Sequence, residues 1–223
     1  MAAHLSSHTV NALLSTRLIP VFYHPELLAC IEAVQAAYQA GVRVFEFVNR
    51  GEKAYEVFVG LKMYVQKHLP DLALGVGTVF DSATANKFIW AGADFLVSPI
   101  VHPPLGELCR QARIPWIPGV FSPTECYLAV QEGADFVKLF PADALGPEFL
   151  KTLKGPMPEL KAIVSGGIQP TEKGIRQWMG AGAVAVSMGT ALFAGTDPQQ
   201  LMTTCLSWLQ NSTISSGISS PVA

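Results

Sequence analysis

Short runs of β-branched and other apolar residues alternate along the whole chain with longer stretches of helical periodicity. The runs that predict strands are residues 18–23, 43–49, 73–78, 95–100, 116–120, 136–141, 162–167 and 184–189. Helical periodicity fills the intervals, as in residues 26–40, 53–68, 82–91 and 124–132. Eight strands with helices between them predict a closed (β/α)8 barrel of the TIM type, and an open, doubly wound parallel sheet is the alternative.

The two ends of the chain differ from this repeating part. Residues 5–16 have the pattern of a helix, which we expect to pack across the bottom of the barrel. Residues 211–223 are rich in Ser and Gly, and we expect a disordered tail there. No low-complexity linker divides the middle, and about 200–250 residues is a usual size for one barrel. We therefore expect a single barrel domain over residues 1–210.

Composition narrows the range of partners. Half of the 223 residues are hydrophobic and 14% are charged, against roughly 25% charged in an average globular chain. So few charges suggest that part of the surface is covered in an oligomer. A net charge of −2 without a basic stripe argues against nucleic acid as a partner. The uncharged stretch 181–195 is too short and Gly-rich to span a bilayer. With no CxxC pair and no signal-like N-terminus, we expect a cytoplasmic protein without a membrane partner.

The sixth predicted strand carries a lysine among apolar residues. Because side chains alternate along a strand, Lys138 shares a face with Phe136 and Phe140. Burial disfavours the charged ammonium, and a neutral amine is the nucleophile that carbonyl chemistry requires. The alternative is a lysine that extends outward at a strand edge, which an interior strand of a closed barrel makes less favourable.

The second predicted strand holds two charged residues of the same parity. Glu46 lies among aromatic residues and valines, and Arg50 follows near the strand's end. Ionised groups are rarely buried without a partner. They could form a structural ion pair with each other, or Glu46 could simply pair with Lys138. The functional interpretation is that Glu46 moves protons and Arg50 binds a substrate carboxylate.

Small and hydroxyl-bearing residues end three other strands. Glycines before Thr78 let a ligand approach the backbone, and the Thr78 hydroxyl can bind a carboxylate, although a simple strand-to-helix turn explains this pattern nearly as well. Glycines also end the seventh and eighth strands, in Ser165-Gly166-Gly167 and Gly189-Thr190. Barrels often bind phosphate at these two positions, so a phosphorylated ligand is expected.

Other kinds of site find little support in the sequence. The five histidines show no metal-ligand spacing such as HxH at a strand end. No GxSxG motif is present, and the four cysteines lie in apolar helical patterns rather than at strand ends. We therefore expect no metal and no cofactor.

Over residues 13–209 the chain resembles the bacterial 2-keto-3-deoxy-6-phosphogluconate (KDPG) and 4-hydroxy-2-oxoglutarate (KHG) aldolases. The resemblance rests on several motifs in the same order: Ile19-Pro20-Val21, Glu46 with Arg50, Gly77-Thr78-Val79, Ser98-Pro99, Ile117-Pro118-Gly119, Lys138-Leu139-Phe140-Pro141-Ala142 and Gly166-Gly167-Ile168. Any one of these motifs would be weak alone. Their common order makes the resemblance specific.

The resemblance implies a class I (Schiff-base) aldolase that cleaves KDPG to pyruvate and glyceraldehyde 3-phosphate. Lys138 would form the Schiff base and Glu46 would be the general acid and base. The remaining roles it implies are carboxylate binding by Arg50 and Thr78, pocket lining by Pro99 and Phe140, substrate contact by Ser165, and phosphate binding around Gly166, Gly167, Gly189 and Thr190. It also implies a homotrimer without a cofactor.

Three departures from the family pattern lie at the expected pocket. Residues 47–49 read Phe-Val-Asn where many members have Val-Thr-Leu, Ile100 replaces a common glycine, and Ser165 stands where many have threonine. These changes bear on the substrate more than on the reaction. Two alternatives therefore stay open: the same chemistry on KHG or on 2-keto-3-deoxy-6-phosphogalactonate, and a non-catalytic barrel that binds sugar phosphates.

Overall fold

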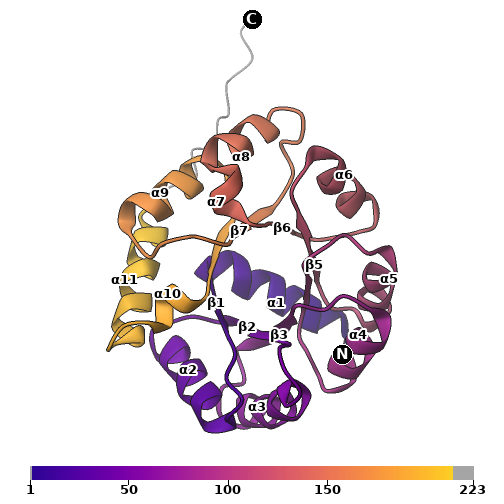
Figure 1. Ribbon diagram of the computed structural model, residues 1–223, viewed down its shortest axis with the longest axis vertical. Helices are drawn as coiled ribbons and strands as arrows, with labels where there is room; N and C mark the ends of the chain where they lie inside the picture. Colours follow the sequence, from indigo (N-terminus) through magenta and orange to yellow (C-terminus); the bar gives the residue numbers. More distant parts are fainter. Residues whose placement is uncertain (1, 213–223) are drawn as a thin grey trace, which may run out of the picture.

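The computed structural model describes residues 2–212, and it is a closed barrel of eight parallel strands that follow one another in chain order (Figure 1). The strands are β1 (Leu18–Phe22), β2 (Val44–Val48), β3 (Ala73–Gly77), β4 (Leu96–Ser98), β5 (Trp116–Val120), β6 (Val137–Leu139), β7 (Ala162–Ser165) and β8 (Ala185–Met188). The predicted (β/α)8 barrel is confirmed, and the open doubly wound sheet is excluded.

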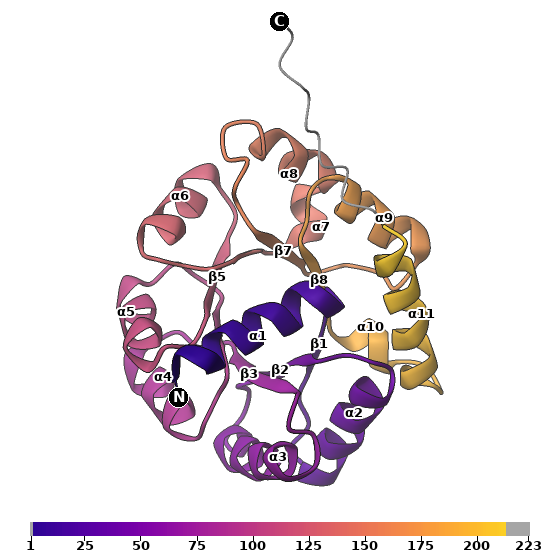
Figure 2. The same ribbon diagram turned by 180° about the vertical axis from the view of Figure 1, so that it is seen from behind.

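Helices surround the barrel and follow each strand. They are α2 (Leu27–Gln39), α3 (Ala54–His68), α4 (Ser82–Trp90), α5 (Pro103–Ala112), α6 (Pro123–Gln131), α7 (Ala142–Leu145), α8 (Pro147–Leu153), α9 (Glu172–Gly180), α10 (Thr190–Phe193) and α11 (Pro198–Gln210). Helix α1 (Ala2–Thr16) crosses the bottom of the barrel, as expected, and Figure 2 shows it in front of the strands. Of the expected polar tail, residues 213–223 lie outside the described residues.

Several strands are shorter than the apolar runs that predicted them. Strands β4 and β6 have three residues each, although the runs covered six. The reason is that apolar character marks burial, whereas a strand is defined by its ladder of hydrogen bonds. Phe95 and Phe136, which precede these two strands, are nearly fully buried in the barrel interior without belonging to the strands.

Strand parity separates the barrel interior from the layer beneath the helices. In β2, Phe45 and Phe47 point outward into the large apolar cluster under the helices, where Phe47 packs edge-on against Phe58 of α3. Val44 points inward, into a smaller cluster that Ala12 and Leu13 of α1 close from below. Glu46 has the same parity as Val44, so its carboxylate points into the barrel.

The barrel interior is built in layers to which alternate strands contribute. The lower layers are apolar, with Ile19, Ile117 and Ile163 among their members. One of these layers lacks a side chain at Gly75, and the ring of Phe95 fills that space. A Cβ at Gly75 would lie 2.4 Å from the ring. The interior becomes polar only above these layers, toward the C-terminal ends of the strands.

Candidate active site

A pocket of about 410 Å³ opens at the C-terminal ends of the strands. All eleven residues singled out from the sequence line it: Glu46, Arg50, Thr78, Pro99, Lys138, Phe140, Ser165, Gly166, Gly167, Gly189 and Thr190. The structure therefore brings together side chains that are up to 144 positions apart between Glu46 and Thr190. Barrel enzymes have their active sites at this face, so this pocket is the candidate site.

Lys138 and Glu46 meet across the barrel at the bottom of the pocket. The Nζ atom of Lys138 donates a hydrogen bond to Oε1 of Glu46 at 3.3 Å. The two side chains are only 12% and 4% exposed. Of the structural alternatives for Glu46, the partner in the structure is thus Lys138 and not Arg50. A buried amine beside a carboxylate that can accept or return its proton suits general acid–base chemistry.

Two glycines of the barrel, one on β3 and one on β5, let other groups approach their strands closely. A Cβ at Gly77 of β3 would lie 1.9 Å from Oε1 of Glu46, so only glycine leaves room for the carboxylate. A Cβ at Gly119 of β5 would lie 2.5 Å from the backbone oxygen of Pro99. The space at Gly77 is thus taken by the Glu46 carboxylate and that at Gly119 by the backbone of Pro99, while Lys138 still borders the pocket.

Phe140 follows the end of β6 and has the same parity as Lys138. The Lys138 ammonium is 5.5 Å from the centre of its ring, within the range of a cation–π contact. The ring is 41% exposed and stands at the pocket mouth. It can therefore shield the amine from bulk water while a substrate enters beside it.

Arg50 and Thr78 occupy the side of the pocket formed by β2 and β3. Within the described residues Arg50 has no ion-pair partner, which leaves its guanidinium free for an anion. Thr78 has a φ angle of +65°, which is uncommon for a β-branched residue. Strained backbone at a pocket wall is often retained because it aims a functional group.

The opposite side of the pocket is made by the loops after β7 and β8. Gly166 and Gly167 adopt φ angles of +92° and +71°, which favour glycine, and both border the cavity. Just beneath them, the hydroxyls of Ser165 and Ser187 are 3.4 Å apart. Ser187 was not among the site residues expected from the sequence, because a serine near the end of a strand carries no distinctive local signal.

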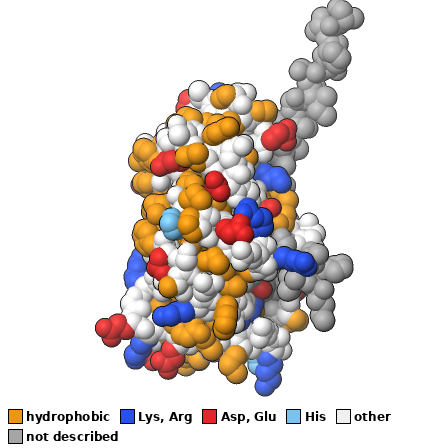
Figure 3. Space-filling model, turned by 90° about the vertical axis from the view of Figure 1, so that its right-hand side faces the viewer, with side chains coloured by type: hydrophobic (Ala, Val, Ile, Leu, Met, Phe, Trp, Pro, Cys, Tyr) orange, Lys and Arg blue, Asp and Glu red, His pale blue; other side chains and the backbone are white. Residues whose placement is uncertain are grey.

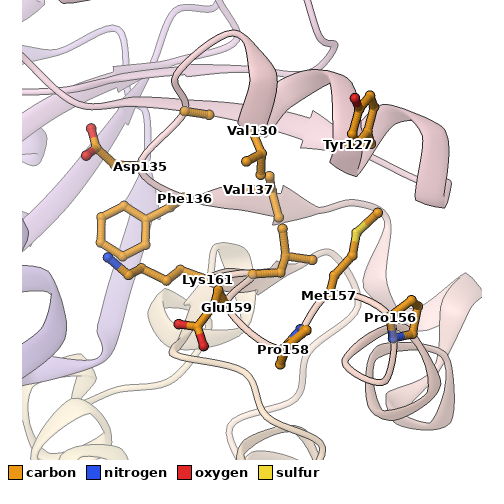
Figure 4. A pocket seen from close by; sticks show the side chains of 12 residues that line it. Tyr127, Val130, Asp135, Phe136, Val137, Pro156, Met157, Pro158, Glu159 and Lys161 are labelled. Atoms are coloured by element: carbon orange, nitrogen blue, oxygen red, sulfur yellow. The ribbon is translucent and has the colours of Figure 1, made fainter.

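A second cavity, of about 520 Å³, lies on the outer wall of the barrel between α6 and the segment that enters β7 (Figure 4). Tyr127, Met157 and Lys161 are among its lining residues. Asp135 and Lys161 belong to the entry sides of β6 and β7, away from the catalytic face. None of the residues singled out from the sequence borders it, so its greater volume does not make it the candidate site.

Cysteine chemistry is not available at the pocket. All four cysteines are free and buried under the helices, at Cys30, Cys109, Cys126 and Cys205. Burial raises the pKa of the Cys109 thiol to about 12 and those of Cys126 and Cys205 to about 11. They therefore remain protonated thiols near neutral pH and are poor nucleophiles. Within the described residues no three His, Cys, Asp or Glu side chains are grouped in a way that could hold a metal ion.

Fold and pocket together define a barrel enzyme with a buried lysine–carboxylate pair at its catalytic face. The family model described as KDPG and KHG aldolase matches residues 10–200 of the chain. The KHG/KDPG aldolase of Escherichia coli (strain K12) is 30% identical over 154 residues, 69% of this chain and 70% of the relative. The chain therefore belongs to the KDPG and KHG aldolase family, and it is a carbon–carbon lyase.

Solved structures of the same family have the same fold. A 4-hydroxy-2-oxoglutarate/KDPG aldolase from TTHB1 superposes with a TM-score of 0.78 at 27% identity, covering 90% of this chain and 98% of that one. A KDPG aldolase from Legionella pneumophila, crystallised with pyruvate captured as a covalent carbinolamine intermediate, has a TM-score of 0.76 at 26% identity, covering 88% and 95%.

Proposed function

We propose that the chain is a Schiff-base aldolase in which Lys138 attacks the C2 ketone of a 2-keto acid. The observation that carries this proposal is the 3.3 Å contact between Lys138 and Glu46 on the floor of the pocket. Transfer of a proton from the ammonium to Glu46 produces the neutral amine that can attack a carbonyl carbon. The carbinolamine captured in the Legionella relative is the intermediate that such an attack forms.

Bond cleavage follows from the charge of the imine. Loss of water from the carbinolamine leaves a protonated imine at C2, which accepts the electron pair of the C3–C4 bond. That bond breaks when the C4 hydroxyl loses its proton, and Glu46 is the buried base on the pocket floor that can take it, directly or through a water. Glu46 then returns a proton to the enamine carbon. Hydrolysis of the imine releases pyruvate.

The rest of the pocket supports KDPG as the substrate. Arg50 and Thr78 would bind the C1 carboxylate on one side of Lys138, and Ser165 would contact the chain of the sugar acid. The loops with Gly166, Gly167, Gly189 and Thr190 would bind the phosphate on the other side. A volume of about 410 Å³ lies within the range of about 300–1,000 Å³ usual for small-molecule sites. The aldehyde product would then be glyceraldehyde 3-phosphate.

Borohydride trapping tests the Schiff base directly. Reduction in the presence of pyruvate should add one pyruvate-derived mass to the peptide containing Lys138, and Lys138→Ala should lose both the adduct and cleavage. Lys161→Ala is a matched control, because the Nζ atom of Lys161 lies 5.7 Å from the ring of Phe136 much as Lys138 lies by Phe140. Normal cleavage by Lys138→Ala would disprove the proposal.

Comparison of kcat/KM tests the substrate. KDPG should give the highest value. A higher value with KHG or with 2-keto-3-deoxy-6-phosphogalactonate would show that this compound is the preferred substrate of the same reaction. A non-catalytic barrel that binds sugar phosphates would bind phosphate esters without trapping any imine, and the Lys138–Glu46 pair is the observation that disfavours it.

We also propose a cytoplasmic homotrimer. Four free cysteines suit a reducing compartment. None of the helices in residues 2–212 is long and apolar enough to cross a membrane.

The trimer is proposed from exposed apolar side chains. Phe80, Ile100 and Phe121, which we call the rim patch, are 46–52% exposed in three consecutive loops beside the pocket. Figure 3 shows hydrophobic side chains spread over the side of the molecule that carries α5 and α6. Exposed apolar surface of this kind is typical of an interface.

A further inference from the structure

A buried serine lies in the same layer of the barrel as Lys138 and Glu46. Ser187 belongs to β8, is 2% exposed, and borders the candidate pocket. None of the roles proposed above involves it. Its place relative to the reactive pair follows from the strand register.

In a barrel of eight strands with a shear of eight, residues at one height advance by one position per strand. Lys138 of β6 pairs with Ile163 of β7, and Ile163 pairs with Ala185 of β8. Over these two strands the residue at the same height moves on by two positions, from Ala185 to Ser187. The same rule connects Ser187 to Glu46: Ser187 pairs with Ile19, and Val21, two positions on, pairs with Glu46. Ser187 therefore lies on the wall between the strands that carry the two reactive groups.

The fourth member of this layer provides a comparison. Val97 of β4 occupies the position opposite Ser187, on the other wall between β2 and β6, and it is buried in the apolar interior. Because an apolar side chain fills one of these two positions, packing alone does not require a hydroxyl at the other. A buried hydroxyl is costly unless it is hydrogen-bonded, and Ser187 has Ser165 at 3.4 Å for this purpose.

The two hydroxyls lead from the pocket down to the reactive layer. Ser165 borders the cavity one layer above, whereas Ser187 is surrounded below by Ile19 and Ile163. The polar groups that Ser187 can face are therefore Ser165, Lys138 and Glu46. A small polar molecule on the pocket floor would find its hydrogen-bond partners among these four side chains.

We propose that Ser187 is a catalytic residue in imine formation, and this inference rests on the proposed Schiff-base function. When Nζ of Lys138 bonds to C2, the electron pair of the C=O π bond moves to the oxygen, which takes a proton from the new ammonium. Glu46, carrying the proton it accepted from Lys138, then protonates this hydroxyl. The C2–O bond breaks, water leaves, and the nitrogen lone pair forms the protonated imine. Ser187, oriented by Ser165, holds the departing oxygen by a hydrogen bond and undergoes no net change.

Loss of oxygen-18 from pyruvate labelled at C2 measures this step alone, because exchange through the imine needs no carbon–carbon cleavage. With wild-type protein, exchange should exceed the uncatalysed rate, and Lys138→Ala should abolish the excess. Ser187→Ala should slow it by about tenfold, the effect expected for loss of one hydrogen bond to a neutral group. The pyruvate concentration that gives half-maximal exchange should change by less than about twofold, because the ground-state contacts remain.

Two further variants separate a hydrogen bond to the departing oxygen from simple packing. Ser187→Thr keeps the hydroxyl and adds a methyl group beside an open pocket, so it should restore most of the exchange rate. Ser98→Ala removes an equally buried hydroxyl that faces away from the pocket, where it accepts from Trp116 and donates to the backbone oxygen of Ile100. That variant should lose stability and exchange at nearly the wild-type rate.

The possible outcomes distinguish this inference from the function on which it rests. Wild-type exchange by folded Ser187→Ala overturns the role of Ser187 while leaving the Schiff base intact. Should that variant fail to fold, Ser187→Cys, of similar size and with a weaker donor, replaces it, and wild-type exchange there is equally decisive. No catalysed exchange and no borohydride adduct with the wild-type protein would overturn the Schiff-base function and this inference together.

Discussion

At the scale of single residues, two glycines of β3 differ in which group occupies the space of the missing Cβ. A Cβ at Gly77 would overlap the Glu46 carboxylate, whereas a Cβ at Gly75, two residues earlier on the same face of β3, would overlap the ring of Phe95 in the apolar interior. One glycine therefore gives room to a reactive group and the other to the core. Substitution by alanine should separate activity from stability.

Gly77→Ala should displace Glu46 from Lys138 and lower kcat by at least about tenfold, since general acid–base catalysis typically contributes 10²–10⁴-fold. Gly75→Ala should cost about 1–3 kcal/mol of folding free energy through overpacking and leave kcat per folded molecule close to wild type. Urea unfolding and steady-state kinetics on both variants provide the comparison. Equal kcat for Gly77→Ala and wild type would show that the position of Glu46 is unimportant.

The positions of Lys138 and Glu46 could be predicted from the sequence better than those of the side chains around them. Lys138 and Glu46 were conspicuous because charged residues are rare inside apolar strands. Ser187 was not, because serine is common in strands and loops and nothing in its local pattern distinguishes it. Its place beside the reactive pair depends on the register of four strand pairs, made by five strands, which no local pattern contains. The catalytic roles themselves stay predictions until the variants are measured.

At the scale of elements, α4 and α6 begin with side-chain caps. Asp81 precedes α4 and accepts hydrogen bonds from the backbone N–H and the hydroxyl of Thr84. Ser122 and Glu125 form a capping box at the start of α6. The predicted starts of both helices lie within one residue of those observed, and so do those of α2 and α3, which have no side-chain cap. Strand ends depend on neighbouring strands and were less accurately predicted.

The contribution of the α4 cap to stability should decrease as the pH falls. The hydrogen bonds from Thr84, the backbone N–H first, lower the pKa of Asp81 below its usual value of 3.8. A depressed pKa in the folded state stabilises the protein above the unfolded pKa, and this contribution is lost as the pH falls through the folded one. Asp81→Ala should therefore cost about 1 kcal/mol at pH 7 and less near pH 3.

Urea unfolding at the two pH values measures the cost of Asp81→Ala. Asp81→Asn is the matched control, because the amide oxygen still accepts from Thr84 but does not titrate. Relative to Asp81→Ala, its stability should depend little on pH. If Asp81→Ala cost the same at both pH values, the ionised carboxylate would not be the source of the stabilisation.

At the scale of the whole molecule, the barrel could be predicted because its pattern repeats. Eight apolar runs separated by helical stretches leave few other topologies, and chain order around the closed sheet follows from the short right-handed connections. The number of copies that assemble has no such repeating signal. It depends on which exposed apolar side chains come together in three dimensions, and the rim patch is the group beside the pocket.

A trimer should have three times the 23.9 kDa of the chain in sedimentation velocity experiments. Replacing Phe80 and Phe121 of the rim patch by glutamate should lower the mass toward one copy, because two charges per copy would be buried at the interface without partners. Trp90→Glu is the control, since this indole is 88% exposed at the far end of α4. A monomeric wild type would disprove the trimer. A trimer that survives the double substitution but dissociates with Trp90→Glu would place the interface away from the pocket.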